Sequence, residues 1–478
     1  MKPYDVIIIG AGAVGTSIAR ELSRYKLSIA ILEKEEELSF GVSKSNSGII
    51  HPGTHNPRNS LKGRLCVQGN KLIHKISQEL GVDFKQVGEL VLAFKEEDLS
   101  GLTRLKQEGE ALGVPGLQIV DRSWLGAHEP NLSAAAIAAL YAPTAGIISP
   151  YRLVYDLAEN AIRNGVEIYH GHKVANIESC AGRSFEINSS CGKFSARYII
   201  NAAGLYADEV SAMVGVNDFN ITPRKGEEFI LDKKREHIVN HLLFPLPSKT
   251  SKGVLVIKTA DGNPMIGPTA QDCSDKEDLS TSGEGLIQVL SGVRQMIPSI
   301  SENDIIAYFA GLRPVAGEDF IIRHEEKVPG FINVAGIQSP GLTAAPAIAL
   351  LVCDILAKNG LSLKKKLFFY KHRKREIHLF AVSLARTEKL IKKDRAYGDI
   401  VCRCEMVSAK EIHEAITHGA TTMDGIKFRT RAQAGRCHGN FCTTRVMKIL
   451  AAQTGKSLAQ ISKKGAGSEI VKGDRGNA

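Results

Sequence analysis

The sequence lacks any run of 18 consecutive apolar residues, so it predicts no membrane-spanning helix. Near its start, the apolar stretch Val6–Ile9 runs straight into Gly10 without a cleavage site, which indicates a buried strand and not a secretory signal. The chain also lacks an even number of cysteines: it has nine, and without a secretion signal they are not expected to form a disulfide framework. These absences predict a cytoplasmic protein whose cysteines bind metal or remain free thiols.

Acidic side chains are scarce in the last quarter of the chain. Residues 361–400 hold twelve Lys/Arg and four Asp/Glu, a net charge of +8, and residues 401–478 hold thirteen and six, a net charge of +7. Since the whole chain carries +10, residues 1–360 carry −5. Such a basic region can dock an acidic protein, an anionic membrane surface or nucleic acid, or it can be the solvated surface of a connecting helix.

The length of 478 residues suffices for about three domains. Apolar patterning predicts a βαβ unit at the start, formed by strand Asp5–Ile9, helix Thr16–Arg24 and strand Leu27–Glu33. The same patterns predict further elements, namely helices at 60–81, Tyr151–Asn164 and Leu342–Lys358, and strands at Gly88–Phe94, Val166–Tyr169, Ala196–Ala203 and Phe331–Ala335. Short apolar runs that alternate with Gly and Pro predict a mixed sheet over 219–320.

The C-terminal quarter divides into three predicted parts. Residues 361–397 are expected to form a basic, helical connector. Residues 398–455 are expected to form a small cysteine-bearing module with helices near Ser408–His418 and Thr443–Thr454. The tail at 456–478 is rich in Gly, Lys and Ser and is expected to be disordered.

A dinucleotide fingerprint follows the first predicted strand. Gly10 allows a tight turn, Gly12 lets the backbone approach a pyrophosphate, and Gly15 lets the helix pack closely on the strand. The helix N-terminus offers N–H groups to phosphate, and Glu33, at the end of the next strand, can bind ribose hydroxyls. The pattern predicts nucleotide binding but does not separate FAD from NAD, and a glycine-rich structural turn is the alternative.

Two further stretches favour FAD. Residues 201–208 resemble the second flavin-contacting stretch of the D-amino-acid oxidase-like flavoproteins, and residues 336–343 resemble the third. The resemblance implies FAD contacts from these residues, from the fingerprint unit and from the segment 43–51, which runs beside the pyrophosphate and flavin in that family. The implied contacts are Gly10, Gly12, Gly15, Glu33, Lys34, Ser45, Asn46, Ser47, Ala203, Gly204, Gly336, Ser339, Gly341, Leu342 and Thr343. The expected fold class is α/β: a Rossmann-like FAD-binding domain (parts at 1–90, 140–215 and 325–360) is interleaved with a mixed-sheet substrate domain (90–140 and 215–325).

Three residues are candidates for the substrate pocket. His51 can act as the general base that accepts a hydroxyl proton, or it can serve only as a loop residue that hydrogen-bonds the flavin or the backbone. Arg313, just before a proline, can fork onto a carboxylate or phosphate, as the family's substrate-binding arginine does, or pair at the surface with Glu318 or Asp319. Lys258 can line the same cavity.

The segment that follows Lys258 is a weaker candidate for the cavity. Asp261 and Asn263 are read either as further lining residues or as a polar hairpin turn.

Four cysteines form two tight pairs, Cys402 with Cys404 and Cys437 with Cys442. Paired thiolates suit a soft metal centre, and zinc is the main rival of an iron–sulfur cluster. C-x-C spacing is uncommon in zinc sites, which favours the cluster. The string resembles the bacterioferritin-associated ferredoxin-like [2Fe–2S] domain, including Arg429, Arg431 and Arg436 around the second pair. This predicts a small α-helical [2Fe–2S] module, in which His438 is a loop residue and not a Rieske-type ligand.

The order of FAD domain, basic connector and ferredoxin-like module resembles the large catalytic subunit of anaerobic glycerol-3-phosphate dehydrogenase. This resemblance implies oxidation of sn-glycerol 3-phosphate by hydride transfer to FAD, with electrons relayed through a [2Fe–2S] centre. The segments at 45–53 and 61–69 look closer to L-2-hydroxyglutarate oxidases and dehydrogenases, and an arginine usual near Asn46 in the glycerol-3-phosphate enzymes is absent. A 2-hydroxy acid is therefore the alternative substrate. Amine oxidation and a purely electron-transferring subunit are further alternatives.

The expected partners are a small anionic substrate and an electron acceptor. The acceptor is a second subunit, a quinone or a ferredoxin-type protein. The basic C-terminal region is expected to allow peripheral contact with the inner face of a membrane, and no nucleic-acid partner is expected.

Overall fold

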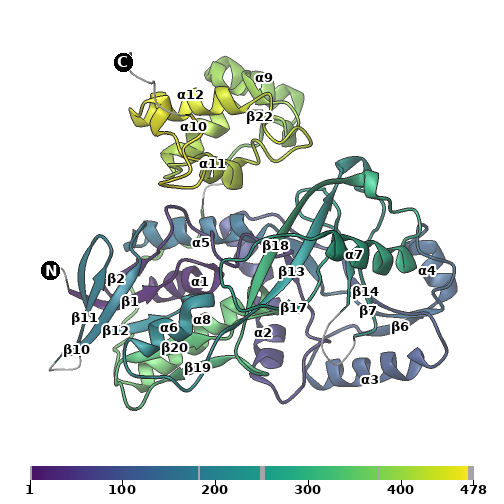
Figure 1. Ribbon diagram of the computed structural model, residues 1–478, viewed down its shortest axis with the longest axis horizontal. Coiled ribbons are helices and arrows are strands. Elements are labelled where there is room, and N and C mark those ends of the chain that lie inside the picture. Colours follow the sequence, from purple (N-terminus) through teal and green to yellow (C-terminus); the bar gives the residue numbers. More distant parts are fainter. Residues whose placement is uncertain (1–2, 181–183, 248–252, 374–375, 472–478) are drawn as a thin grey trace.

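Two large β-sheets form the main body, and a small helical module lies beside them (Figure 1). The computed structural model describes residues 3–180, 184–247, 253–373 and 376–471. In the first sheet, five parallel strands lie in the order β20, β12, β1, β2, β9, with bounds Phe331–Ala335, Gly192–Asn201, Pro3–Ile9, Ile29–Leu32 and Val166–Tyr169. Three antiparallel strands extend it: β10 (Val174–Cys180), β11 (Ser184–Ser189) and β19 (Ile321–His324).

Helices cover this parallel sheet and explain why its strands read as continuous apolar runs. The helices are α1 (Ala13–Leu22), α2 (Leu61–Leu80), α5 (Pro150–Arg163), α6 (Ala207–Ala212) and α8 (Gly341–Lys358). By length and composition α8 could cross a membrane, but 67% of it is buried inside the fold, where it packs on α1 and α2. Its apolar character is thus that of a core helix.

The second sheet is mixed and holds nine strands. The strands are β5 (Glu89–Ala93), β6 (Gln118–Asp121), β7 (Ala138–Ala142), β13 (Thr222–Leu231), β14 (Leu242–Pro245), β15 (Leu255–Ile257), β16 (Met265–Gly267), β17 (Gln271–Asp272) and β18 (Ile305–Val315). Three helices accompany it: α3 (Asp98–Ala111), α4 (Arg122–His128) and α7 (Gly283–Met296). A separate three-stranded sheet contains β3 (Ile49–Ile50), β4 (Phe84–Gln86) and β8 (Gly146–Ile148). In the chain, β4 directly precedes β5 and β8 directly follows β7 of the second sheet. The fold class predicted from the sequence is confirmed.

The module has its own apolar core. It contains α9 (Leu384–Lys393), β21 (Ile400–Cys402), β22 (Val407–Ser408), α10 (Ala409–Thr417), α11 (Met423–Thr430) and α12 (Thr443–Thr454). Ile412, Ile426, Val446 and Leu450 are fully buried in this core. In Figure 1 the module lies over α5 and the upper ends of β13 and β18.

The predicted boundaries are within a few residues of the observed ones for the main body, and two strands, Val166–Tyr169 and Phe331–Ala335, match fully. The helical connector is a correction. Residues 361–373 are extended and follow the edge of the main body: the Lys26 N–H donates to the Lys364 carbonyl, and the Lys366 N–H donates to the Arg24 carbonyl. Between 361 and 397, α9 is the one α-helix that the described residues form.

The expected disorder of the tail is also wrong for residues 456–471. Ile461 is fully buried in the module core, and the Ser462 and Lys463 carbonyls accept hydrogen bonds from the Met423 and Asp424 N–H groups at the start of α11. Residues 472–478 lie outside the described residues.

Candidate active site and cysteine centre

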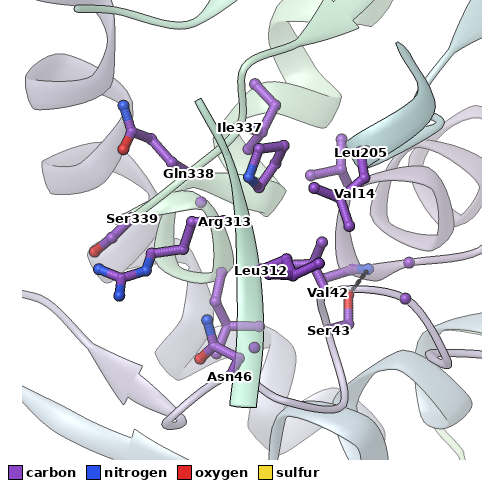
Figure 2. A pocket seen from close by; sticks show the side chains of 18 of the residues that line it. Val14, Val42, Ser43, Asn46, Leu205, Leu312, Arg313, Ile337, Gln338 and Ser339 are labelled. Carbon is purple, nitrogen blue, oxygen red and sulfur yellow. Dashed lines mark hydrogen bonds between the residues drawn. The ribbon is translucent and has the colours of Figure 1, made fainter. Parts of the chain in front are cut away.

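One cavity of about 1100 Å³ extends from the glycine-rich segments to strands β13 and β18 of the second sheet. Figure 2 shows side chains from the start of α1, from the 42–46 loop, from β18 and from the 337–339 turn around it. Most predicted cofactor and substrate residues line it, namely Gly10, Gly12, Glu33, Lys34, Ser45, Asn46, Ser47, His51, Ala203, Gly204, Arg313, Ser339, Gly341 and Leu342. Residues distant in sequence therefore meet at one site.

The fingerprint glycines have separable tasks. Gly10 adopts φ +103, and a side chain there would meet the Ala202 carbonyl at 2.5 Å. At Gly15 a Cβ would lie 2.0 Å from the Gly10 carbonyl, so this glycine packs under the turn and does not face the cavity. Gly12 faces the cavity at the N-terminus of α1, whose Ala13 N–H donates to Ser43 Oγ at 3.0 Å. This open N-terminus fits a pyrophosphate.

Glu33, the residue after β2 and the predicted ribose-binding acid, lines the cavity. Its Oε2 accepts from the Ala11 N–H at 2.7 Å and its Oε1 from the Glu35 N–H at 3.0 Å. Burial raises the pKa of Glu33, against these two N–H groups, which lower it. The carboxyl group thus braces the fingerprint turn and presents its edge to the cavity.

The third stretch places the start of α8 at the cavity. Gly341 and Leu342 line the cavity, so the positive end of this 18-residue helix points at the site, where it favours developing negative charge on a bound flavin. Gly336 and Thr343 are not among the described residues that line the cavity. Thr343 Oγ1 accepts from the His51 N–H at 2.9 Å, so its described contact is with the His51 loop.

His51 lies at the substrate end of the cavity and is 7% exposed. Its Nε2 is 3.3 Å from Ser339 Oγ, and its Nδ1 is 3.8 Å from Glu89 Oε2. The carbonyl of His51 accepts from Asn70 Nδ2 at 3.1 Å. The ring is therefore held between a cavity-lining hydroxyl and a buried carboxylate, an arrangement suited to a general base.

Sequence reasoning missed Glu89. It is the first residue of β5 and is fully buried, with His55 Nε2 at 2.8 Å from its Oε1. The signal that could have found it is a charged residue at the head of an otherwise apolar strand, because a buried charge needs a partner.

Arg313 reaches into the cavity from β18, on the side where Ser339 lies (Figure 2). Its Nη2 donates to the Thr269 carbonyl at 2.6 Å. Among the described residues no carboxylate forms an ion pair with it, and Asp319 instead accepts from the Leu61 and Lys62 N–H groups. The predicted alternative, a surface pair with Glu318 or Asp319, is therefore wrong.

One buried carboxyl group lies close enough to Arg313 to interact with its charge. Glu228, from the neighbouring strand β13, lines the cavity and is 5% exposed. Burial raises the pKa of Glu228 to about 8, and the nearby Arg313 charge only partly opposes this. A protonated Glu228 leaves the guanidinium charge available to an anionic ligand.

The candidates around Lys258 belong elsewhere. Lys258 follows β15 and is half-buried, but it is not among the described residues that line the cavity. Asp261 Oδ2 accepts from Arg431 Nη1 at 2.7 Å and from the Tyr151 hydroxyl at 2.6 Å, and Asn263 Oδ1 accepts from Arg431 Nη2 at 3.1 Å. This turn is where the cysteine module docks.

The four paired cysteines come together in the module. Cys404 Sγ and Cys437 Sγ are 3.5 Å apart, and the thiols of Cys402 and Cys442 are hydrogen-bonded to each other. Cys402 and Cys442 are each 1% exposed, whereas Cys404 is exposed and Cys437 is half-buried. Cys442 is the N-cap residue of α12, which begins where a helix was predicted. Four converging sulfurs fit a [2Fe–2S] cluster with one edge toward solvent.

Backbone N–H groups approach these sulfurs, whereas the predicted arginines pair with carboxylates. The N–H groups of Glu405 and Gln433 point at Cys402 Sγ, as expected around an iron–sulfur centre. The predicted arginines each pair with a carboxylate: Arg429 with Glu37 at 3.0 Å, Arg431 with Glu405 at 2.8 Å and Arg436 with Asp232 at 3.2 Å.

Glu37 anchors the module to the main body. It is fully buried, and its Oε1 accepts from the Thr421 N–H and the Thr422 hydroxyl while its Oε2 accepts from Arg429. The same loop carries Phe40, whose ring packs edge-on against Phe428 of α11 at 5.6 Å. His438 Nε2 donates to the Ile306 carbonyl, 2.7 Å away on β18, so His438 serves the interface. The loop that lines the cavity thus also holds the module.

Comparisons with known proteins agree with this geometry. The chain matches the family described as DAO, FAD dependent oxidoreductase, over residues 5–355, and the BFD-like [2Fe-2S] binding domain over residues 400–452. It is 42% identical over 98% of both chains to a glycerol 3-phosphate dehydrogenase from Caloramator mitchellensis. An L-2-hydroxyglutarate dehydrogenase from Indibacter alkaliphilus is 29% identical over 73% of this chain and 98% of its own.

Among solved structures, the dithionite-reduced, FAD-bound L-alpha-glycerophosphate oxidase from Mycoplasma pneumoniae is similar, with a TM-score of 0.76 and 31% identity. It covers 79% of this chain and 100% of its own length. These matches confirm both cofactors predicted from the sequence, FAD and a [2Fe–2S] cluster.

Proposed function

Because the chain belongs to the family of FAD dependent oxidoreductases and carries a BFD-like [2Fe-2S] binding domain, we propose that it is a dehydrogenase of sn-glycerol 3-phosphate. When bound, FAD would supply the hydride acceptor, and the [2Fe–2S] centre would supply a one-electron path onward. The site must therefore bind an anion and remove a proton from a hydroxyl group.

The observation that carries the proposal is the placement of Arg313 and His51 in one cavity. Arg313 offers two parallel N–H donors to phosphate oxygens, and charge-assisted bonds of this kind are among the strongest in proteins. His51 Nε2 faces the same space beside Ser339 and accepts the proton of the substrate hydroxyl as the carbon-bound hydrogen leaves as hydride. Anchor and base together select a secondary alcohol beside an anionic group.

A 2-hydroxy acid is the second candidate, because one guanidinium also binds a carboxylate and the 43–53 loop at the cavity contains no arginine. Asn46, in this loop, uses its Oδ1 to accept from the Gly48 N–H at 2.8 Å.

The test is an anaerobic substrate screen followed by flavin bleaching. sn-Glycerol 3-phosphate, L-2-hydroxyglutarate, glycerol and glycine are added separately to the purified holoprotein. Bleaching by glycerol 3-phosphate at low concentration, without bleaching by glycerol, supports the proposal. Bleaching by L-2-hydroxyglutarate alone assigns the second candidate, and bleaching by glycine alone would show that the protein oxidises amines.

For the acceptor, we propose an electron-transfer protein with an acidic face. The outer edge of the cysteine centre carries Cys404, the exposed side chains of Phe441 (79%) and Met406 (38%), and Arg403, for which no ion pair exists among the described residues. An apolar contact with a cation beside it fits a partner with carboxylates around its own redox centre.

Arg403→Glu tests this acceptor with an acidic [2Fe–2S] ferredoxin as the probe. We expect the variant to weaken ferredoxin binding, measured calorimetrically at low salt, at least tenfold, while Lys392→Glu on the exposed face of α9 changes it little. If ferredoxin does not bind the wild type, but anionic vesicles containing a quinone do, the acceptor lies in the membrane and this proposal is wrong.

A further inference from the structure

Glu89 is a charged group in a place where charge is costly. It is fully buried at the head of β5, between the second sheet and the loop that carries His51 and His55. Its Oε1 accepts from Thr54 Oγ1 at 3.2 Å and lies 2.8 Å from His55 Nε2, and its Oε2 lies 3.8 Å from His51 Nδ1. An ionised carboxylate persists at such a site only when its neighbours compensate the lost hydration.

Two imidazoles provide this compensation. Burial by itself raises the pKa of Glu89, but His55 and His51 outweigh it and hold the pKa well below its usual range. Glu89 is therefore ionised in the folded protein at neutral pH. His55 is fixed in turn by stacking on Phe244, with ring centroids 4.9 Å apart.

The two nitrogens of His51 face different surroundings. Nδ1 faces the buried carboxylate, and Nε2 faces Ser339 at the cavity. A carboxylate behind one imidazole nitrogen favours the tautomer with its proton on that nitrogen, and it stabilises the imidazolium formed when the other nitrogen takes up a proton.

We propose that Glu89 is the positioning residue for His51, with His55 and Thr54 holding Glu89 in turn. The proposal rests on the proposed role of His51 as the base. The substrate O–H bond breaks and its proton goes to His51 Nε2, while the carbon-bound hydrogen leaves with its electron pair to FAD. Glu89 keeps its charge throughout and receives no proton.

The titration of His51 is the direct readout. The charged and titratable groups that face it are Glu89 from β5, His55 from its own loop, Cys66 of α2, whose Sγ is 3.7 Å from the His51 carbonyl, and Arg313 across the cavity. Of these, Glu89 is the one permanent anion. Its removal must lower the pKa of His51.

Glu89→Gln keeps the shape and an acceptor oxygen but removes the charge. Histidine resonances of the substrate-free holoprotein, assigned with His51→Asn, should show the His51 titration shifted by at least one pH unit toward acid. Flavin reduction at saturating glycerol 3-phosphate should slow about 100-fold, with FAD content unchanged. Glu89→Asp, which retains the charge, should recover part of both properties.

A matched control exists in the same protein. Glu129 is also fully buried and lies 2.7 Å from an imidazole nitrogen of His241, but it does not line the cavity. Glu129→Gln should cost stability without moving the His51 titration or the rate of flavin reduction.

Two outcomes separate the possible failures. An unshifted His51 titration in folded Glu89→Gln overturns the positioning role whatever the substrate is. If Glu89→Gln shifts the His51 titration but glycerol 3-phosphate does not reduce the flavin of the wild type, the positioning role stands and the proposed substrate is wrong.

Discussion

The flavin cavity and the cysteine module assemble their functional groups over very different lengths of chain. The cavity draws its lining from Ile9 to Leu342, through two sheets and several loops, whereas the four cysteines lie within residues 402–442 and converge inside one small core. A cluster site of this kind depends on four side chains, and losing one removes the centre. The cavity divides binding, proton transfer and electrostatics among separate residues, so single changes there should weaken one property at a time.

The two regions are joined by a buried link. Glu37 lies in the loop between β2 and the cavity-lining serines, and it pairs with Arg429 of the module. This link holds the cluster domain against the domain that binds FAD.

The largest effect is expected in the module. Cys404→Ser removes one of four cluster ligands, so acid-labile sulfide and electron transfer to a one-electron protein acceptor should fall below detection, while glycerol 3-phosphate still bleaches the flavin. Cys191→Ser, at another exposed cysteine, should change neither. Loss of bleaching in Cys404→Ser would mean that the two regions are not separable.

In the cavity, Arg313→Lys should affect binding alone. It keeps the charge but loses the planar pair of donors, and each lost charge-assisted bond is worth about 1.5–3 kcal/mol, so the KM for glycerol 3-phosphate should rise roughly tenfold to a hundredfold. Steady-state kinetics with a dye acceptor measures this, and Arg323→Lys, at an exposed ion pair on β19, is the control. An unchanged KM would remove Arg313 from the anion site.

Glu37→Gln tests the link between the regions. The buried Arg429 would lose its charged partner, and the unfolding free energy of the docked protein should fall by about 1–3 kcal/mol. Thermal unfolding, together with proteolysis of the 361–383 segment, should reveal looser docking. Glu388→Gln, whose ion pair with Lys392 is exposed, should have no such effect. Equal stability of the two variants would show that the Glu37 contact does not fix the module.

The smallest effect concerns pH. Glu228 has its pKa raised to about 8 by burial, so its ionisation above that value places a competing negative charge near Arg313, and KM should rise up to tenfold at about pH 9. Glu228→Gln should abolish this rise. A KM that is flat in the wild type up to pH 9 would contradict the raised pKa.

The same shift makes a stability prediction. Between the ordinary glutamate value of 4.5 and about 8 the folded protein holds one more proton than the unfolded chain, so stability falls as pH rises through this window. The contribution is complete below the unfolded pKa and lost above the folded one. Stability of Glu228→Gln should lack this slope.

The sequence predicted what local patterns encode. Gly10, Gly12, Gly15 and the two cysteine pairs carry backbone or ligand demands that few other residues meet, so their roles could be inferred from residue type and spacing alone. Strand and helix positions followed from continuous apolar runs covered on both faces.

The remaining parts depend on contacts between distant segments. Glu89 looks like any charged residue at the start of a strand until folding places it behind His51, 38 positions earlier in the chain. Asp261 and Asn263 were candidates for the cavity because they follow Lys258, but Arg431 draws them into the interface. The connector was expected to be helical from its composition, yet hydrogen bonds to the Arg24–Lys26 edge favour an extended path.

The central claim is that electrons enter at the cavity and leave through the cysteine module of the same chain. Rapid mixing of the oxidised holoprotein with sn-glycerol 3-phosphate under anaerobic conditions, followed by optical detection of the flavin and paramagnetic resonance of frozen samples, tests it directly. The account predicts that flavin bleaching is followed by the signal of a reduced [2Fe–2S] cluster, and that the cluster signal, but not the bleaching, is absent in Cys404→Ser. Bleached flavin beside a cluster that stays oxidised in the wild type would contradict the account.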